Sequence, residues 1–386
     1  MGVFVGKGRK ARRCYGFDEI ALVPGRVTID PIEVDIRWRL KELEFEIPII
    51  AAAMDGVTDV RFAIEMGRLG GFAVLNLEGI QTRYENPQSI IDEIINASSE
   101  EATNILQRMY REPVKEDLIG KRIEEIKKEG VTACVSCTPQ NAVRFGHLAQ
   151  EAGVDLFVVQ GTVVTTRYIS SKFKGLDFTM FCKDIKIPVI VGNCVTYEVA
   201  LELMETGITA LLVGVGPGTA CTTRGVLGIG VPQVTATIDC AMARDFYYKK
   251  TGRYVPIITD GGMRVGGDIC KAFASGADCV MIGSAFAKAR EAPGKGYHWG
   301  MATPHQYLPR GTRIHVGTTG TLEEILYGPA HLDDGSQNLV GALRVAMGMC
   351  GAKNIREMQM TELIIAPAIQ TEGKIFQRTQ RIGMGK

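Results

Sequence analysis

One short segment of the chain concentrates residues capable of covalent chemistry. Residues 214–225 read Gly-Val-Gly-Pro-Gly-Thr-Ala-Cys-Thr-Thr-Arg-Gly, and their cysteine is Cys221. Glycines let the backbone turn its N–H groups toward an anion or its carbonyls toward a cation, and they place the thiol on a loop that solvent can reach. A thiolate there is a nucleophile. The local sequence also allows a buried, inert thiol, the usual state of a free cysteine, so both interpretations stay open.

Two other short motifs offer groups that bind nucleotides. Asp260 precedes Gly261 and Gly262, and a carboxylate beside flexible residues suits the acceptance of two hydrogen bonds from a ribose diol. Gly283 and Ser284 follow the next apolar run, where the last loops of a barrel commonly hold phosphate. Each motif alone is weak, because Asp-Gly-Gly is more often a turn. Together with the thiol they predict a nucleoside monophosphate site.

The elements that must position these motifs are short, almost continuously apolar runs, which is the pattern of parallel strands buried on both faces. Helical patterns fill the intervals, for example at 140–152, 197–206 and 267–275. Alternating strands and helices predict an α/β protein with a (β/α)8 TIM barrel, with a doubly wound sheet as the structural rival. The eight predicted strands are residues 48–53, 71–75, 131–136, 154–160, 187–192, 210–214, 255–259 and 279–282.

The 386 residues have room for one large barrel or two ordinary domains. No internal repeat or composition shift marks a linker, so we predict one catalytic domain spanning 1–386. Within it, residues 1–15 are interpreted as a solvated basic N-terminal arm and residues 80–130 as helical decoration of the barrel. Residues 295–386 are interpreted as a short flap and a C-terminal segment.

Composition excludes several classes of function. The formal net charge is +1, from 44 basic and 43 acidic residues, so we expect neither a nucleic-acid partner nor a membrane partner. No apolar run approaches the roughly 20 residues of a membrane-spanning helix. Ten scattered cysteines fit the reducing cytoplasm better than a secreted disulfide scaffold. Cys134 and Cys137 form a C-x-x-C without the second pair that a zinc site needs.

Further motifs extend the pattern over nearly the whole chain. They are residues 17–24 (FDEIALVP), residues 51–58 (AAAMDGVT), Gly192-Asn193 and Trp299-Gly300-Met301. With the thiol loop, Asp260-Gly261-Gly262 and Gly283-Ser284, they match in order and spacing the motifs of the IMP dehydrogenase and GMP reductase family, which the chain resembles. The resemblance implies a barrel without inserted CBS regulatory domains, acting on GMP and IMP. It also implies a homotetramer, with an octamer as the alternative.

Roles for individual residues follow from this resemblance. Cys221 would attack C2 of the purine, and Thr223 would assist proton transfer at the group on C2. Gln160, Gly161 and Thr162 would contact the nicotinamide cofactor. Backbone carbonyls of Gly216, Gly218 and Cys221 would hold a potassium ion. The implied substrate-binding residues are Met54, Asn193, Gly218, Thr219, Asp260, Gly262, Gly283, Ser284, Gly300 and Met301.

The two reactions of the family differ in the fate of the covalent intermediate. Dehydrogenases hydrolyse it with an Arg-Tyr pair on a long flap, and no Arg-Tyr pair occurs between Met301 and Arg310. We therefore expect a GMP reductase that uses NADPH. Two departures count against it: Arg310 stands where the reductases have a glutamate, and Gln160 stands where the dehydrogenases have an aspartate. The alternatives are an IMP dehydrogenase using NAD and a purine-nucleotide sensor with little turnover.

Overall fold

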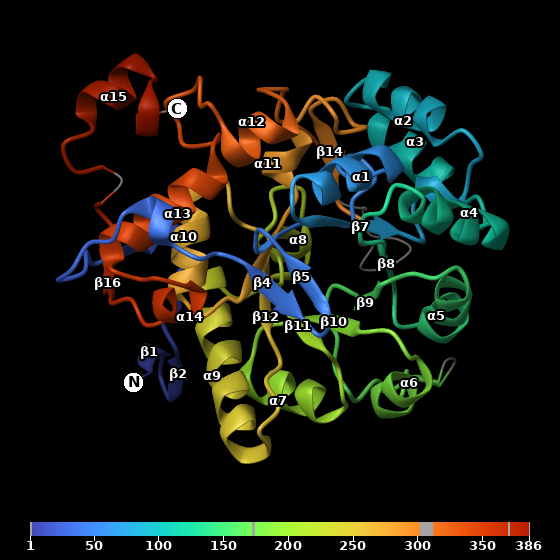
Figure 1. The fold of residues 1–386 in the computed structure, drawn as a ribbon, viewed down its shortest axis with the longest axis horizontal. Helices are drawn as coiled ribbons and strands as arrows, with labels where there is room; N and C mark the ends of the chain where they lie inside the picture. The colour runs from blue at the N-terminus through green and yellow to red at the C-terminus, as the bar shows by residue number, and fades with distance from the viewer. Residues whose placement is uncertain (1, 172–173, 302–311, 370, 386) are drawn as a thin grey trace.

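The computed structural model describes residues 2–171, 174–301, 312–369 and 371–385. Its centre is a closed barrel of eight parallel strands, in which the last strand pairs with the first (Figure 1). All eight strands predicted from the sequence are present, so the TIM barrel is confirmed and the doubly wound sheet is excluded. The barrel strands are β6 (Ile49–Ala51), β7 (Phe72–Asn76), β8 (Cys134–Cys137), β9 (Leu156–Gln160), β10 (Val189–Cys194), β11 (Ala210–Val213), β12 (Ile257–Asp260) and β13 (Cys279–Ile282).

Helices surround this barrel (Figure 1). The predicted helices at 140–152, 197–206 and 267–275 are α5, α7 and α10. The main surrounding helices are α1 (Val60–Arg68), α4 (Glu116–Lys127), α5 (Ala142–Glu151), α6 (Phe178–Asp184), α7 (Tyr197–Glu205), α9 (Gln233–Thr251), α10 (Gly266–Ala274) and α13 (Leu339–Cys350).

The segment between β7 and β8 contains both added helices and a helix of the barrel itself. It forms α2 (Pro87–Asn96), α3 (Ala102–Met109) and α4. Helix α4 packs against α1 on one side and α5 on the other, as a helix of the outer ring does, whereas α2 and α3 pack on each other. The structure therefore divides the predicted decoration at 80–130: only α2 and α3 are additions to the barrel.

Alternate residues of each barrel strand belong to different cores. Ile190 of β10 packs inside the barrel with Leu212 and Ile258, whereas Val189 and Val191 pack outward against the helices. This two-sided burial explains why the strands are almost uninterrupted apolar runs in the sequence. Cys134 belongs to the inner core and Cys137 to the outer one, so the two thiols lie on opposite faces of β8 and do not form a shared metal site.

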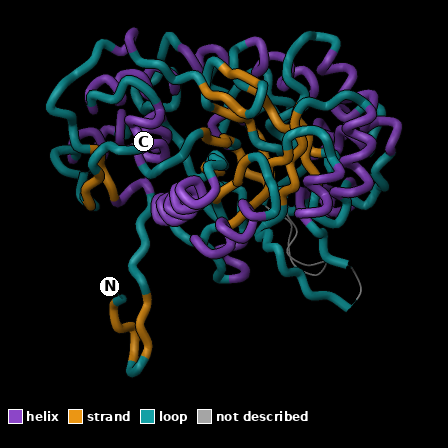
Figure 2. The backbone as a smooth tube through the Cα atoms, turned by 60° about the horizontal axis from the view of Figure 1, so that its bottom comes forward, coloured by secondary structure: helices purple, strands orange, loops and turns teal. Residues whose placement is uncertain are grey.

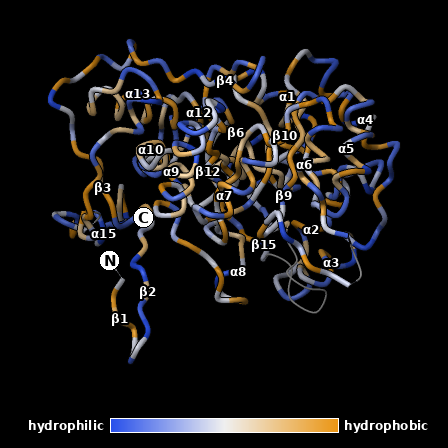
Figure 3. Tube along the Cα trace, turned by 90° about the horizontal axis from the view of Figure 1, so that it is seen from below, coloured by the Kyte–Doolittle hydropathy of each residue, from blue (hydrophilic) through white to orange (hydrophobic). Residues whose placement is uncertain are grey.

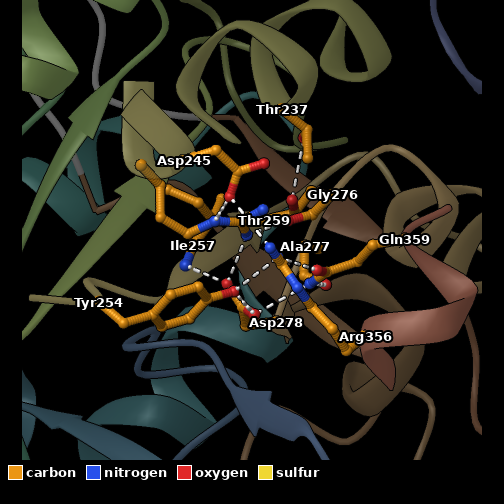
Figure 4. Close-up of polar contacts among 11 residues, drawn as sticks. Thr237, Asp245, Tyr254, Ile257, Thr259, Gly276, Ala277, Asp278, Arg356 and Gln359 are labelled. Atoms are coloured by element: carbon orange, nitrogen blue, oxygen red, sulfur yellow. Dashed lines mark hydrogen bonds and ion pairs between the residues drawn. The ribbon is translucent and has the colours of Figure 1, made fainter. Parts of the chain in front are cut away.

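The amino-terminal end of the barrel is closed by packing and polar contacts. A hairpin of β4 (Trp38–Leu40) and β5 (Leu43–Phe45) packs on Phe72, with the rings of Phe45 and Phe72 4.6 Å apart. Near the starts of β12 and β13, buried Arg244 of α9 donates to Asp278 at 2.8 Å. Tyr254 and Gln359 donate to the same carboxylate (Figure 4). Polar groups at this end of a TIM barrel support stability rather than catalysis.

The N-terminal arm is an exposed hairpin. Strands β1 (Val3–Gly6) and β2 (Arg9–Ala11) pair with each other and stand away from the body (Figure 2). Strand β1 is hydrophobic and β2 is hydrophilic (Figure 3), so the arm is not uniformly polar. Arg12 fastens its base through a two-pronged ion pair with Asp239 of α9.

The chain after β13 completes the wall of the open end and one side of the molecule. Among the described residues, no helix is both long enough and apolar enough to span a membrane. The elements after β13 are α11 (Ser284–Ala287), β14 (Tyr297–Trp299), β15 (Arg313–His315), α12 (Leu322–Tyr327), α13, α14 (Ile355–Met358), β16 (Leu363–Ile365) and α15 (Ile375–Gln380). Two short elements precede β13: β3 (Ile20–Leu22), which pairs with β16, and α8 (Thr223–Leu227), which follows the glycine-rich segment after β11.

Candidate active site

A cavity of about 780 Å³ opens at the carboxyl ends of the barrel strands. Every residue predicted from the sequence to bind substrate, cofactor or cation, or to act in catalysis, lines this one cavity. They come together because the carboxyl ends of parallel strands in a closed barrel face the same side. Arg310, where the expected acid is missing, lies outside the described residues.

The thiol of Cys221 is accessible from the cavity. All ten cysteines are described, and Cys221 alone is exposed. Its Sγ donates to Oγ1 of Thr223 at 3.2 Å, and Thr223 is buried at the start of α8. The backbone N–H of Cys221 donates to the carbonyl of Gly218 at 3.0 Å, which closes the glycine loop into a tight turn. Cys221 is therefore not the buried cysteine that its local sequence also allowed.

Two side chains brace the loop that carries this thiol. Arg224 of α8 donates to the carbonyl of Val231 at 2.7 Å and so holds α8 against the segment that precedes α9. Gln233, which is buried, donates to the carbonyl of Val213 at 2.7 Å and to that of Asp260 at 3.2 Å. Gln233 therefore fixes the end of β11, where the loop starts, against the end of β12. The sequence did not identify this contact, because no local pattern indicates which carbonyls a glutamine bridges.

Asp260 faces the cavity within a polar cluster. Its Oδ2 accepts from Asn193 Nδ2 at 2.8 Å and from Gln160 Nε2 at 3.2 Å. Burial raises the pKa of Asp260 to about 6, and the hydrogen bond from Asn193 lowers it only in part. Among the described residues, none donates to Oδ1, which leaves that oxygen to a ligand. The amide of Gln160, predicted to contact the cofactor, is directed toward this carboxylate.

Backbone conformation explains the glycines that follow Asp260. Gly261 and Gly262 both have positive φ, 82° and 83°. A Cβ atom on Gly262 would lie 3.1 Å from Cβ of Pro217, in the thiol loop. These two glycines therefore allow the turn after β12 to pass close under the loop. On the next strand end, a Cβ atom on Gly283 would lie 2.9 Å from the sulfur of Met54, so Met54 and Gly283 form one continuous wall.

A buried chain of hydrogen bonds supports Gly300 and Met301. Trp299 Nε1 donates to the hydroxyl of Tyr110 at 2.8 Å, and that hydroxyl donates to Oδ2 of Asp55. The amide of Ile80 donates to the same oxygen at 3.0 Å. Tyr110 follows the added helix α3, so the decoration of the barrel reaches back to the site. No local sequence pattern indicates this contact, because it joins residues far apart in the chain.

The cavity continues past the thiol toward the ends of β7 and β8. Glu78 accepts from the backbone N–H of Thr138 at 2.5 Å and from Asn141 Nδ2 at 2.6 Å. Thr138 and Glu78 both line the cavity beside Gly161 and Thr162. The sequence did not identify either residue. The described residues contain no cluster of three or more His, Cys, Asp or Glu side chains placed to hold a metal ion.

The fold and the site together define a TIM-barrel protein with a thiol and a carboxylate facing one cavity. The chain belongs to the IMP dehydrogenase and GMP reductase family, because the model of the IMP dehydrogenase / GMP reductase domain matches residues 14–375. Members of this family are oxidoreductases that bind purine nucleoside monophosphates and use a nicotinamide cofactor.

Individual relatives agree with this assignment. An uncharacterized oxidoreductase of Mycolicibacterium smegmatis is 38% identical over 372 residues, which cover 94% of this chain and 99% of that protein. The inosine-5'-monophosphate dehydrogenase of Cryptosporidium parvum is 32% identical over 386 residues, covering 89% of each. The crystal structure of an IMP dehydrogenase/GMP reductase-like protein from Corynebacterium glutamicum superimposes with a TM-score of 0.89 at 34% identity, covering 94% of this chain and 97% of that one.

Proposed function

We propose that this protein is a GMP reductase, which converts GMP and NADPH into IMP, ammonia and NADP⁺. The observation that carries the proposal is the contact between Cys221 Sγ and Thr223 Oγ1, at 3.2 Å in a cavity that also contains Asp260. A nucleophile within hydrogen-bond reach of a proton carrier is the pattern of covalent catalysis. Asp260 would hold the ribose diol through Oδ1, with Gly283 and Ser284 at the phosphate.

In the first step, Sγ of Cys221 bonds to C2 of GMP and the bond from C2 to the amino group breaks. The thiol proton passes to Thr223 Oγ1, and the hydroxyl gives a proton to the departing amino group, which leaves as ammonia. This relay needs no carboxylic acid, so it accommodates Arg310 in place of the glutamate. Arginine itself does not donate a proton near neutral pH.

In the second step, a hydride would reach C2, and bound NADPH would be its source. The bond between C2 and sulfur breaks, and its electron pair stays on Cys221, which then takes a proton from water. IMP is released. Gly161, Thr162 and Thr138 line the part of the cavity that would hold the nicotinamide side of the cofactor. The choice of NADPH over NADH belongs to the proposal.

The flap favours the reductase over the dehydrogenase. Strands β14 and β15 pair antiparallel, with Trp299 opposite Arg313, so the chain leaves and re-enters the described residues at neighbouring points. Residues 302–309, Ala-Thr-Pro-His-Gln-Tyr-Leu-Pro, contain no arginine and hence no Arg-Tyr pair. The usual base for hydrolysis of the covalent intermediate is thus missing from residues 302–309.

The experiment is a pair of absorbance assays on the purified protein. Oxidation of NADPH in the presence of GMP, with IMP as the product, is the expected result. Reduction of NAD with IMP, and no reaction with GMP, would establish the alternative dehydrogenase. Inactivity in both assays combined with tight IMP binding would instead fit a purine-nucleotide sensor.

A further inference from the structure

The histidine of strand β14 is buried without a hydrogen-bond partner. His298 is 1% exposed and lies in the wall of the active-site cavity. Among the described residues, none makes a hydrogen bond to its Nδ1 or its Nε2. A buried polar group left unpaired destabilises the folded state. A native structure that carries such a group in a ligand cavity points to a ligand as the missing partner.

The position of His298 on β14 fixes the part of the cavity that it faces. Side chains alternate along a strand, and Trp299 points away from the cavity into the cluster with Tyr110. His298 therefore points to the opposite side. Strand β14 packs against α11, which begins at Ser284 directly after Gly283. A Cβ atom on Gly56 would lie 2.9 Å from Cα of His298, so the histidine is pressed against the loop after β6.

The surroundings keep this imidazole neutral in the empty site. Burial lowers the pKa of His298 to about 4, so it carries one N–H donor and one acceptor at neutral pH. Helix α11, of sequence Ser-Ala-Phe-Ala, offers no titratable side chain. On the loop after β6, the carboxylate of Asp55 already accepts from Ile80 and Tyr110.

The charged groups of the neighbouring strand are engaged elsewhere. On β15, Arg313 donates to the carbonyl of Ala97 at 2.9 Å. His315 stacks on Tyr297 with ring centres 4.2 Å apart, and it is exposed. No described group on these elements therefore supplies the charge or the hydrogen bond that His298 lacks.

We propose that His298 binds the phosphate of the nucleotide and takes up a proton as it does so. The inference rests on the proposed function only in placing a nucleoside monophosphate in the cavity. A phosphate monoester is a dianion above its second pKa of about 6, and a dianion beside the imidazole favours the charged, doubly donating form. The empty site holds neutral histidine, and the occupied site holds imidazolium.

This coupling makes the affinity for nucleotide depend on pH. The pKa of His298 would be raised from about 4 when phosphate binds, so the affinity falls as the pH rises from about 4 to the pKa of the complex and levels off above it. Above pH 7 the phosphate is already dianionic, so a decrease in affinity there reports on the histidine. Inosine, which lacks the phosphate, would show no such dependence.

The test is isothermal titration calorimetry of IMP and of inosine, with wild-type protein and with His298→Gln. In two buffers of different ionisation enthalpy at pH 7, we expect net proton uptake by wild type with IMP and none with inosine. His298→Gln should bind IMP about 10- to 100-fold more weakly, the loss of one charged hydrogen bond, and bind inosine as wild type does. His315→Gln, which changes the exposed histidine of β15, is the matched control and should behave as wild type.

Two outcomes would overturn the inference. Equal weakening of IMP and inosine by His298→Gln would place the histidine at the base or the sugar. Binding of IMP to wild type without proton uptake would exclude the imidazolium, and this measurement does not depend on whether the variant folds. Neither outcome bears on the reductase assay, so failure of the proposed reaction and failure of this inference are seen in different experiments.

Discussion

Asp260→Asn separates the two roles that a partly buried carboxylate can have, support of the fold and recognition of a ligand. Asparagine preserves the shape, and its oxygen can still accept from Asn193 and Gln160 in place of Oδ2. Its amide NH₂ then occupies the position of Oδ1 and presents a donor to the ribose diol. The charged acceptor is lost while the internal hydrogen bonds are kept.

The magnitude on binding follows from the bonds that disappear. A hydrogen bond to a charged group contributes about 1.5–3 kcal/mol. Loss of the diol contact should therefore cost about 3 kcal/mol, or roughly 150-fold in kcat/KM for GMP. The diol is held alike in the ground state and the transition state, so the effect should appear in KM, with kcat within a few-fold of wild type.

The effect on stability has the opposite sign. Burial raises the pKa of Asp260 from 3.8 to about 6, so the ionised carboxylate destabilises the empty protein at pH 7 by up to about 3 kcal/mol. The contribution of protonated Asp260 to stability is complete below pH 3.8 and is lost as the pH rises through about 6. Asp260→Asn should consequently match or exceed wild type in melting temperature at pH 7, and this advantage should vanish toward pH 4.

The assay combines steady-state kinetics with thermal unfolding at pH 4.5, 6 and 7.5. Asp239→Asn, which alters an aspartate paired with Arg12 away from the cavity, is the control and should leave the kinetics unchanged. A melting temperature well below wild type, or a KM for GMP near the wild-type value, would refute the assignment of this carboxylate to the ribose. Wild-type KM should also rise as the pH falls below 6, because protonation removes the charged acceptor.

Three other variants test the remaining parts of the structure. Cys221→Ala should reduce turnover by at least about three orders of magnitude while IMP binding by calorimetry stays within a few-fold, and retained turnover would remove the thiol from the mechanism. Tyr110→Phe deprives Trp299 Nε1 of its hydrogen-bond acceptor. We expect the free energy of unfolding in urea to fall by about 1–3 kcal/mol and the KM for GMP to rise. An unchanged KM would show that this contact does not support the binding of the base. Arg244→Met leaves the buried carboxylate of Asp278 without its cation. The variant should lose about 3–5 kcal/mol of unfolding free energy, with kcat unchanged at 25 °C. A large loss of kcat would contradict the placement of this ion pair at the end of the barrel opposite the cavity.

Much of the fold could be predicted because its signals are local. Each barrel strand is a short apolar run such as residues 187–192, and both of its faces are buried whatever its neighbours are. The polar and glycine residues after the strands mark where the barrel opens. Since all strands run the same way, the ends that carry Cys221, Asp260 and Gly283 had to meet at one cavity, and they do.

Contacts between distant segments were decided only by the tertiary structure. The sequence placed Asp260 in the site but did not show that Gln160 and Asn193 converge on its Oδ2. It treated residues 80–130 as one decoration, although α4 belongs to the outer ring of helices.

The sequence by itself therefore determined the barrel, its open end and the family motifs. Hydrophobic periodicity, the polar and glycine residues at strand ends, and loop composition are all properties of neighbouring residues. The structure alone decided which distant groups pair, as Trp299 does with Tyr110, and which polar group stays unpaired, as His298 does among the described residues. Hydrogen bonding and burial depend on atoms brought together by chain closure over many tens of residues. No local pattern encodes that proximity, so the unpaired imidazole of His298 is a property of the assembled fold.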